Sequence, residues 1–441
     1  MHELLEHCFN LSQHYIFREC GHIIGEKNFK KTWHFSRYFS PQHQGWGNAR
    51  LVILVGPRGI GKTVTLLQDI STHSRALYLP MDDYTLRGWK DASLYTIGKE
   101  YVSYGGNYLL IDEIHKYQNW AQELKSLYDH FPKLKIVVSG SSLLEITKAS
   151  YDLSRRAVIK RVFGMSFREF LLLKYGQKKE IKTYLNYILA KTLNWETFIQ
   201  ESRAEIEKLI QFLEKHNIFL LPEFEQYCKT GYYPYFNEFK NEETFRKTLQ
   251  QQVDATIEAD IPNCFPNFTG ASTKKVGQLL AFLAQSVPYT PNYRELKQAL
   301  GIGDERTLKE YLHILEKAQL IKAINKHHKG FQEVTEPGKF MLFNTNLSWA
   351  LSHEPNKGTQ RETFVASMLS ILEEEKRIKL SLPDHGDFRV QHNQKVYTLE
   401  VGSPNKSFRQ IKDSPTPLVV RDGLRATRSN EIPLWYFGFL Y

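Results

Sequence analysis

Short apolar runs alternate with helix-like segments in the first third of the chain. Leu51–Val55, Ala76–Leu79, Tyr108–Ile111 and Lys135–Ser139 each have the character of a buried strand, and Arg156–Phe163 is a candidate fifth. Segments with helical spacing lie between them, notably Lys62–Ile70 and Trp120–His130. Parallel strands are buried on both faces and need helical crossovers, so this alternation predicts an α/β fold with a doubly wound parallel sheet.

The remaining two thirds of the chain change periodicity twice. From Ser166 to about Asp260 the spacing is helical and rich in charge, with a turn at Gly231–Phe236. From about Lys274 three helices joined by short turns are expected. The later expected elements are strands at Leu320–Ile324 and Phe331–Val334, a helix at Thr363–Lys376, and strands at Asp387–Val390, Lys395–Val401, Pro417–Val420 and Leu434–Phe439.

Composition places the chain among ordinary globular proteins. Of 441 residues, 41% are hydrophobic and 24% are charged, and no run approaches the length of a membrane span. The N-terminus carries acidic residues and no apolar signal core, so we expect a cytoplasmic protein. Four cysteines do not make a disulfide framework in a chain this long. The spacing of Cys8, His14, Cys20 and His22 matches no usual zinc pattern.

The formal net charge of +10 favours an acidic partner such as DNA or RNA. A solvated surface rich in lysine and arginine explains the same number. Charge alone therefore leaves the partner open.

A phosphate-binding loop follows the first predicted strand. Residues 56–63 fit the pattern G-x-x-x-x-G-K-[ST], and a helix follows directly. Glycines let backbone N–H groups converge on phosphate oxygens, and the helix points its positive end at the same place. Lys62 would reach the β- and γ-phosphates, while the Thr63 hydroxyl would ligate Mg²⁺. The expected ATP-binding residues of the loop are Gly56, Pro57, Arg58, Gly59, Ile60, Gly61, Lys62 and Thr63.

Two carboxylates end the third predicted strand. Asp112 and Glu113 follow the apolar run Tyr108–Ile111, at the sheet edge where ligands of α/β proteins bind. We expect Asp112 to hold Mg²⁺ together with Thr63, and Glu113 to polarise the attacking water.

The tip of the fourth strand and the arginines after it are further candidates. In ATPases with an extra central strand, a polar residue at its tip senses the γ-phosphate, and here Ser139 or Ser141 fits. Arg156, preceded by Arg155, could stabilise transition-state charge from its own or a neighbouring subunit. A surface ion pair is the alternative for this arginine.

Four sequence blocks resemble a large family of archaeal and bacterial AAA-type ATPases that end in a domain related to PD-(D/E)XK nucleases. They are GPRGIGKT, LLIDEIHKYQNWAQELKSLYD, IVVSGSS and LSRRAVIKRVFGMSFREF. The resemblance runs from about Asn48 to the end of the chain. It implies that Arg156 occupies the position of the family's arginine after the fourth strand. It also implies a P-loop ATPase core (48–165), a helical region (166–273), a winged helix (274–335) and a degenerate nuclease-like domain (336–441). The pattern of the first 47 residues adds a fifth expected part, an N-terminal helical segment (1–47).

The spacing of the three helices after Lys274 also fits a helix-turn-helix, with Asp304 as the N-cap of the third helix. Arg306 and Lys309 would face a DNA groove, and Lys326, His327, His328 and Lys329 would face phosphates. The same helix carries four acids, which fit a packing module equally well: Asp304, Glu305, Glu310 and Glu316.

The C-terminal piece is similar to a nuclease fold, with Glu362, Asp387 and Glu400 as its carboxylates. In such sites two carboxylates hold a metal, and a lysine two residues after the last acid helps to activate water. Gly402 stands at that position, so we expect no nuclease activity, although Lys406 follows shortly.

Three functions remain after these patterns are combined. The first is an ATPase that drives rearrangement of its appended domains on nucleic acid. The second is a nucleotide-gated switch that binds a protein partner or a second copy of itself, with slow turnover. An ATP-coupled nuclease ranks below both.

Overall fold

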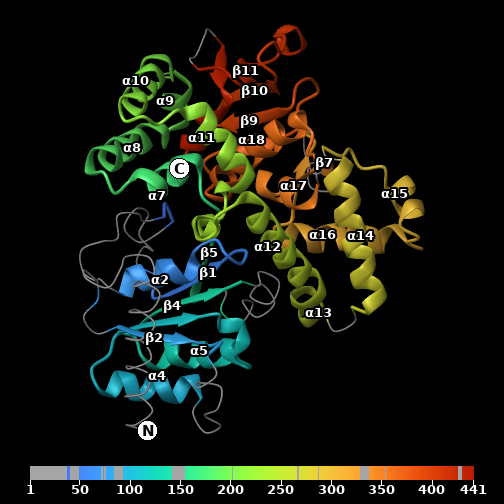
Figure 1. Cartoon of the computed structure of the whole chain (residues 1–441). Coiled ribbons are helices and arrows are strands. Elements are labelled where there is room, and N and C mark those ends of the chain that lie inside the picture. Colours follow the sequence, from blue (N-terminus) through green and yellow to red (C-terminus); the bar gives the residue numbers. More distant parts are fainter. Residues whose placement is uncertain are drawn as a thin grey trace. The chain divides into compact units, whose positions relative to one another are not determined.

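The computed structural model describes two compact units, within Met1–Phe163 and Gly164–Tyr441 (Figure 1). The predicted N-terminal helix and its cysteine and histidine residues lie outside the described residues. The described ranges are 37–39, 49–70, 73, 76–83, 93–141, 153, 155–200, 202–265, 268–286, 288–327, 337–352, 354–425 and 430–441.

A five-stranded parallel sheet forms the centre of the first unit. Its strands lie in the order β2-β3-β4-β1-β5, and every neighbouring pair is parallel. All five predicted strands are present, with ends that differ by up to two residues from the prediction. Their bounds are β1 Leu51–Val55, β2 Ala76–Pro80, β3 Tyr108–Asp112, β4 Lys135–Gly140 and β5 Ala157–Arg161. The predicted α/β parallel sheet is confirmed.

Helices cover both faces of this sheet. The predicted helices α2 (Lys62–Ile70) and α5 (Trp120–His130) are present, and a helix missed by the sequence reading, α4 (Leu94–Ser103), packs against α5. Helices α4 and α5 share one apolar core with alternate residues of β1, β3 and β4, whereas α2 contacts β2, β3 and β4 outside that core. The helix α4 begins where the Ser93 side chain accepts a hydrogen bond from the Thr96 N–H.

The second unit begins with the predicted helical region. The expected turn at Gly231–Phe236 is instead the meeting point of a π-helix, η3 (Tyr227–Gly231), and a 3₁₀-helix, η4 (Pro234–Glu238). The other elements are α7 Phe167–Tyr175, α8 Lys179–Thr192, α9 Trp195–Gln200, α10 Ser202–Lys215, α11 Leu220–Gln226, α12 Glu242–Ala255, η5 Thr256–Asp260 and α13 Ile261–Cys264.

Three helices and a β-ribbon follow, as the sequence predicts. The helices are α14 (Gly270–Ser286), α15 (Tyr293–Ala299) and α16 (Glu305–Lys317). Strand β6 (Ile321–Asn325) pairs antiparallel with β7 (Pro337–Leu342), which begins beyond the expected end of the winged helix at residue 335. The predicted strand at Phe331–Val334 lies outside the described residues.

A mixed five-stranded sheet completes the second unit, in the order β12-β11-β10-β9-β8. Strands β8 to β10 are antiparallel neighbours, while β10, β11 and β12 run parallel. Two helices, α17 and α18, precede the sheet, and α18 packs against β8 and β10. The bounds are α17 Thr345–Leu351, α18 Lys357–Glu374, β8 Lys379–Ser381, β9 Phe388–His392, β10 Lys395–Gly402, β11 Pro417–Arg421 and β12 Glu431–Pro433.

The expected strand at Leu434–Phe439 is wrong, because this segment is a 3₁₀-helix, η8. All six of its residues are buried, so its apolar run reflects burial on every side rather than a strand. Phe439 packs edge-to-face on Phe167, and Tyr436 stacks on Phe198.

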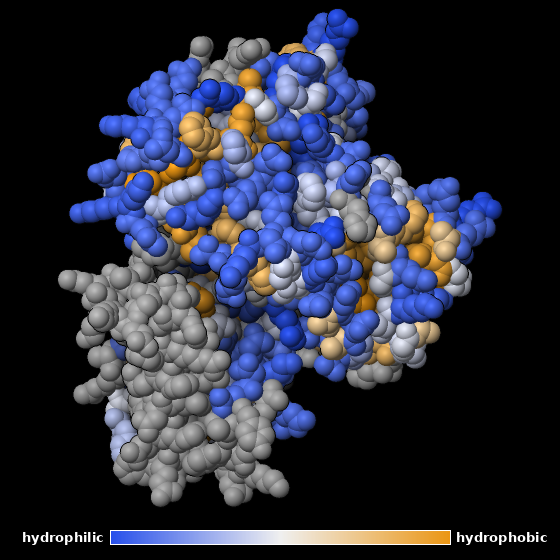
Figure 2. Space-filling view, in the orientation of Figure 1, coloured by the Kyte–Doolittle hydropathy of each residue, from blue (hydrophilic) through white to orange (hydrophobic). Residues whose placement is uncertain are grey.

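The described surface is largely hydrophilic on the face that Figure 2 shows, with hydrophobic side chains in small separate patches. Small patches of this kind are usual for globular proteins. None of the described helices is long and apolar enough to cross a membrane.

Candidate functional site

The loop between β1 and α2 is built around glycines. Gly59 and Gly61 have φ values of 76° and 89°, in the left-handed region that favours glycine. At Gly56 a Cβ atom would lie 2.4 Å from the Val162 carbonyl oxygen and 2.5 Å from Ile60 Cδ1. The loop therefore has the close backbone approach and unusual dihedral angles that a phosphate cradle requires.

Two buried cations brace this loop. The Lys62 ammonium donates to the carbonyl oxygens of Gly56 and Pro57, each at 2.9 Å. The Arg37 guanidinium donates to the Ile60 carbonyl oxygen at 2.5 Å and to the Phe163 carbonyl oxygen at 2.7 Å. Nothing in the spacing of the sequence pointed to Arg37, since it lies 23 residues before its nearer partner.

The Asp112 carboxylate, at the end of β3, accepts hydrogen bonds from several other residues of the site. Its Oδ2 accepts from the Thr63 hydroxyl at 2.6 Å and from the Tyr78 hydroxyl at 2.8 Å. Its Oδ1 accepts from Ser139 Oγ and from the Glu113 N–H, the latter at 3.1 Å. The structure thus brings Thr63, Asp112 and Ser139 together, and it adds Tyr78, which the sequence reading did not single out.

Glu113 follows directly and has an unusual backbone. Its φ of 50° and ψ of 43° lie in the left-handed region, which costs free energy for a residue with a side chain. Ser141 Oγ donates to Glu113 Oε2 at 3.0 Å, so Ser139 and Ser141 serve different carboxylates. Burial raises the pKa of Glu113, and the nearby Lys62 charge opposes that rise. Ser142 lies outside the described residues.

His115 also lies against Glu113 and was not singled out from the sequence. Its Nε2 atom is 3.4 Å from Glu113 Oε2 and 3.4 Å from Ser141 Oγ, and its side chain is 4% exposed. Burial, reinforced by the charges of Lys116, Arg58 and Lys62, lowers the pKa of His115 to about 3. The imidazole is therefore neutral at physiological pH, so its contact with Glu113 is not an ion pair, and its Nε2 shares a hydrogen bond with Ser141 Oγ.

The structure does not bring Arg156 to this site. Arg156 precedes β5, whose residue Ala157 pairs with Leu51 at the start of β1. It therefore lies at the amino ends of the parallel strands, whereas the phosphate-binding loop follows the carboxyl end of β1. Its Nε and Nη2 atoms donate to the two carboxylate oxygens of Asp129, each at 2.8 Å. This pair is the surface ion pair that the sequence left open as the alternative.

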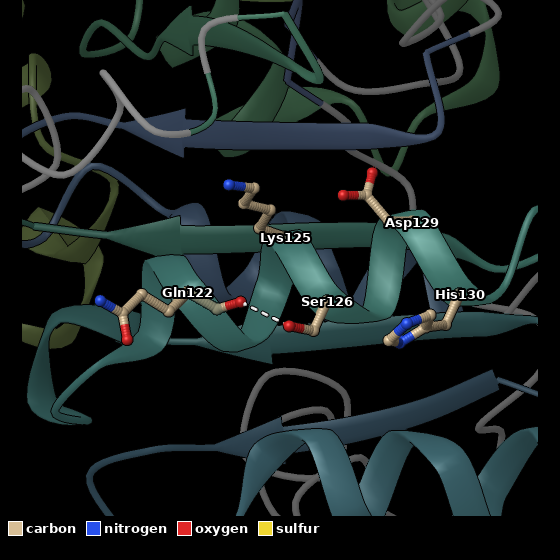
Figure 3. Close-up of a pocket in the computed structure, with 5 residues that line it drawn as sticks. All are labelled: Gln122, Lys125, Ser126, Asp129 and His130. Carbon is tan, nitrogen blue, oxygen red and sulfur yellow. Dashed lines mark hydrogen bonds between the residues drawn. The ribbon is translucent and has the colours of Figure 1, made fainter.

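Asp129 also lines a shallow pocket on the exposed side of α5 (Figure 3). Within it the Ser126 hydroxyl donates to the Gln122 carbonyl oxygen at 3.1 Å. None of the residues predicted for the nucleotide site lines this pocket. Its lining residues are Gln122, Lys125, Ser126, Asp129 and His130.

A second charged cluster lies in the other unit, where α18, β7 and β10 meet. Lys339 Nζ lies 2.6 Å from Glu362 Oε2 and 3.9 Å from Asp387 Oδ1. Asp387 Oδ2 accepts from the Val401 N–H at 2.8 Å. The predicted convergence of Glu362, Asp387 and Glu400 is thus visible, but it includes a lysine from the ribbon that the sequence reading did not include.

The expectation that this cluster lacks an ammonium group at Glu400 is wrong. Lys406 Nζ lies 2.5 Å from Glu400 Oε1, because the chain after β10 turns back towards the carboxylates. A Cβ atom at Gly402 would lie 2.5 Å from Lys406 Cγ, so the lysine stem fills the space that a side chain at residue 402 would need. Burial raises the pKa of Glu400, and its Oε2 has no hydrogen-bond partner among the described residues.

The residues predicted to contact DNA differ in whether they are exposed or paired with other side chains. Lys309 Nζ pairs with Glu305 at 2.8 Å and lies 4.8 Å from the centre of the Tyr293 ring, while Arg306 is exposed. Lys326 forms an isolated β-bridge with Leu382, which joins this end of β6 to the C-terminal part of the unit. His328 and Lys329 lie outside the described residues.

Comparison with known protein families assigns the region that contains the phosphate-binding loop. Residues 48–171 match the model of a family described as an AAA domain. This region is an AAA-type P-loop domain. Residues 221–357 match a domain of unknown function, DUF8612. An AAA domain implies ATP binding, which agrees with the loop, the lysine and the carboxylates described above.

Individual proteins similar to this chain come from archaea and eukaryotes. An uncharacterized protein of Methanocaldococcus jannaschii, MJ1637, is 28% identical over 82% of this chain and 78% of its own length. Among solved structures, the Walker-type ATPase PABY2304 of Pyrococcus abyssi has 13% identity and a TM-score of 0.39, covering 69% of this chain and 91% of that chain. PCH-2 of C. elegans has 18% identity and a TM-score of 0.23, covering 41% and 46%.

We expect no cleavage of nucleic acid by the Glu362–Asp387–Glu400 cluster, even though an ammonium is present. Lys339 and Lys406 already neutralise two of its carboxylates, and no group of three metal-ligating side chains is found in the described part of the chain. The measurement is a cleavage assay on single- and double-stranded DNA and RNA, with Mg²⁺ and with Mn²⁺. Metal-dependent cutting that is lost in Asp387→Ala would contradict this expectation.

Proposed function

We propose that the chain binds Mg-ATP at the AAA domain and hydrolyses it with Glu113 as general base. One observation carries this proposal: Thr63, Asp112, Glu113 and Ser139 meet beside Lys62, at the carboxyl ends of β1, β3 and β4. Ligands of α/β sheets bind at that edge. The left-handed backbone at Gly59 and Gly61 gives the loop the conformation that a phosphate cradle needs.

Each group fits a separate task in this reaction. The loop N–H groups and Lys62 would hold the phosphates, while the Thr63 hydroxyl and the Asp112 carboxylate are the oxygen ligands that Mg²⁺ prefers. When bound, Mg²⁺ neutralises charge that develops on the phosphate oxygens. Glu113 would accept the proton of the attacking water, and Ser139 would hold Asp112 in place.

We propose that the nucleotide cycle rearranges the other parts of the chain on nucleic acid. The basic net charge and the exposed Arg306 on α16 support this proposal. The winged-helix interpretation of α14 to α16 with the β6–β7 ribbon, and the division into five parts, belong to the same proposal. The alternative is a nucleotide-gated protein switch with slow turnover, which the Lys309–Glu305 pair favours because it leaves less positive charge for DNA.

We retain a role for Arg156 only across a subunit boundary. Its distance from the phosphate-binding loop along β5 argues against action in its own site. Its exposure at the surface of the unit is compatible with an interface between copies. Asp129 would then have to release it, since both of its described bonds go to that carboxylate.

The Glu113→Gln variant should bind ATP but lose turnover by about a hundredfold or more, because it removes the general base and keeps the shape of the side chain. The Lys62→Ala variant should lose binding itself, since it removes the positive charge that faces the phosphates. Steady-state hydrolysis and equilibrium binding of a fluorescent ATP analogue separate the two effects. Normal turnover in Glu113→Gln would move the role of base to another residue.

Nucleic acid should stimulate ATP hydrolysis if it is the partner, and reversing the charge of Arg306 and Lys309 together should weaken its binding. Each lost phosphate contact lowers the slope of log affinity against log salt by about one. Lys247→Glu on α12 is a matched surface control. Unchanged affinity and slope in the Arg306→Glu/Lys309→Glu variant, with no stimulation in the wild type, would favour the protein switch.

Mixing Arg156→Ala protein with Lys62→Ala protein should restore part of the hydrolysis rate if Arg156 acts across subunits. Each variant keeps the group that the other lacks, so mixed interfaces contain one complete site. The rate is measured over a range of mixing ratios, with light scattering under ATP to report assembly. No recovery, together with monomeric scattering, would leave Arg156 with the structural role that its pair with Asp129 shows.

A further inference from the structure

The two oxygens of the Glu113 carboxylate have different surroundings. Oε2 lies 3.0 Å from Ser141 Oγ and 3.4 Å from His115 Nε2. Oε1 receives no described hydrogen bond. One oxygen is therefore fixed while the other is available, which is the arrangement that a carboxylate needs to accept a proton in one defined direction.

His115 has a definite hydrogen-bonding role in this arrangement. Its ring is neutral, so only one of the two nitrogens carries a hydrogen. Nδ1 is buried and has no partner among the described residues, whereas Nε2 faces Glu113 and Ser141. The tautomer with the hydrogen on Nε2 places the one N–H where an acceptor lies, so the ring donates to Ser141 Oγ, whose own hydrogen goes to Glu113 Oε2.

The backbone holds the ring in this position. His115 is the middle residue of a short 3₁₀-helix, η1 (Ile114–Lys116), which follows the left-handed residue Glu113. The Lys116 N–H donates to the Glu113 carbonyl oxygen at 2.9 Å, and Ile114 is fully buried in the core beneath the sheet. The imidazole and the carboxylate are thus parts of one tight turn.

We propose that His115 is a positioning residue that, together with Ser141, holds Glu113 Oε2 and leaves Oε1 to accept the proton of the water that attacks ATP. This inference rests on the proposed ATPase function and deepens it. Because the ring is neutral, it does not form an ion pair with Glu113 that would lower the basicity of the carboxylate. His115 touches neither nucleotide nor metal in this role and acts on Glu113 through Ser141.

Two substitutions at His115 separate hydrogen bonding from packing. His115→Leu keeps an apolar side chain of similar bulk but removes the donor to Ser141, so kcat should fall by up to roughly tenfold, in the range for a lost hydrogen bond. KM for ATP and the affinity for an ATP analogue should stay within about twofold. His115→Gln places an amide N–H near the position of Nε2 and should recover most of the lost rate. His130→Leu, at an exposed histidine of α5, is the matched control.

A double variant tests whether His115 acts through Glu113. In the Glu113→Gln background His115→Leu should cause no further loss, because the group that it positions is already gone. A wild-type kcat in His115→Leu, or an equal fold-loss in both backgrounds, would overturn the inference while the ATPase proposal stands. If Glu113→Gln itself keeps the wild-type rate, both fail. Thermal melting shows whether each variant folds. If His115→Leu does not fold, Ser141→Ala replaces it in the test and is expected to lower kcat in the same way.

Discussion

A buried carboxylate, that of Asp112, organises the AAA domain. An ionised carboxylate removed from water is costly unless it is fully hydrogen-bonded. Here four donors surround it, from α2, β2, β4 and the residue that follows it. Because these donors come from different elements, the carboxylate acquires all of them only when α2, β2, β3 and β4 are assembled. The need to satisfy one group thus links the positions of the loop, Ser139 and Glu113.

The residues of the site that could be predicted from sequence are those with a fixed local spacing. The loop from Gly56 to Thr63 is one continuous segment, and Asp112 ends an apolar strand, so both are visible without knowledge of the fold. Tyr78 and Arg37 reach the site from other parts of the chain through side-chain hydrogen bonds. Their contacts depend on strand order and on side-chain direction, and neither leaves a pattern in the sequence.

The second unit shows the same limit in another form. Most helices and strands follow from their spacing of polar and apolar residues, although α18 is buried without a break from Thr363 to Leu372. The segment Leu434–Phe439 has no such spacing and was assigned to the wrong element. Lys406 could be placed only once the path of the chain after β10 was known, since three residues separate it from Gly402, whose side-chain space it fills. A functional group at a familiar place in a motif can therefore be supplied by a residue outside the motif.

The left-handed backbone at Glu113 has a consequence for how this protein responds to selection. Glycine adopts that conformation without steric cost, and asparagine does so more readily than glutamate. A substitution to either would relieve backbone strain and remove a half-buried charge at once. If Glu113 is the general base proposed above, directed evolution for heat resistance alone should therefore enrich inactive sequences at this position. On the proposed mechanism the glutamate would persist only where turnover is also selected, and the strain at residue 113 would then be a trade-off between stability and catalysis.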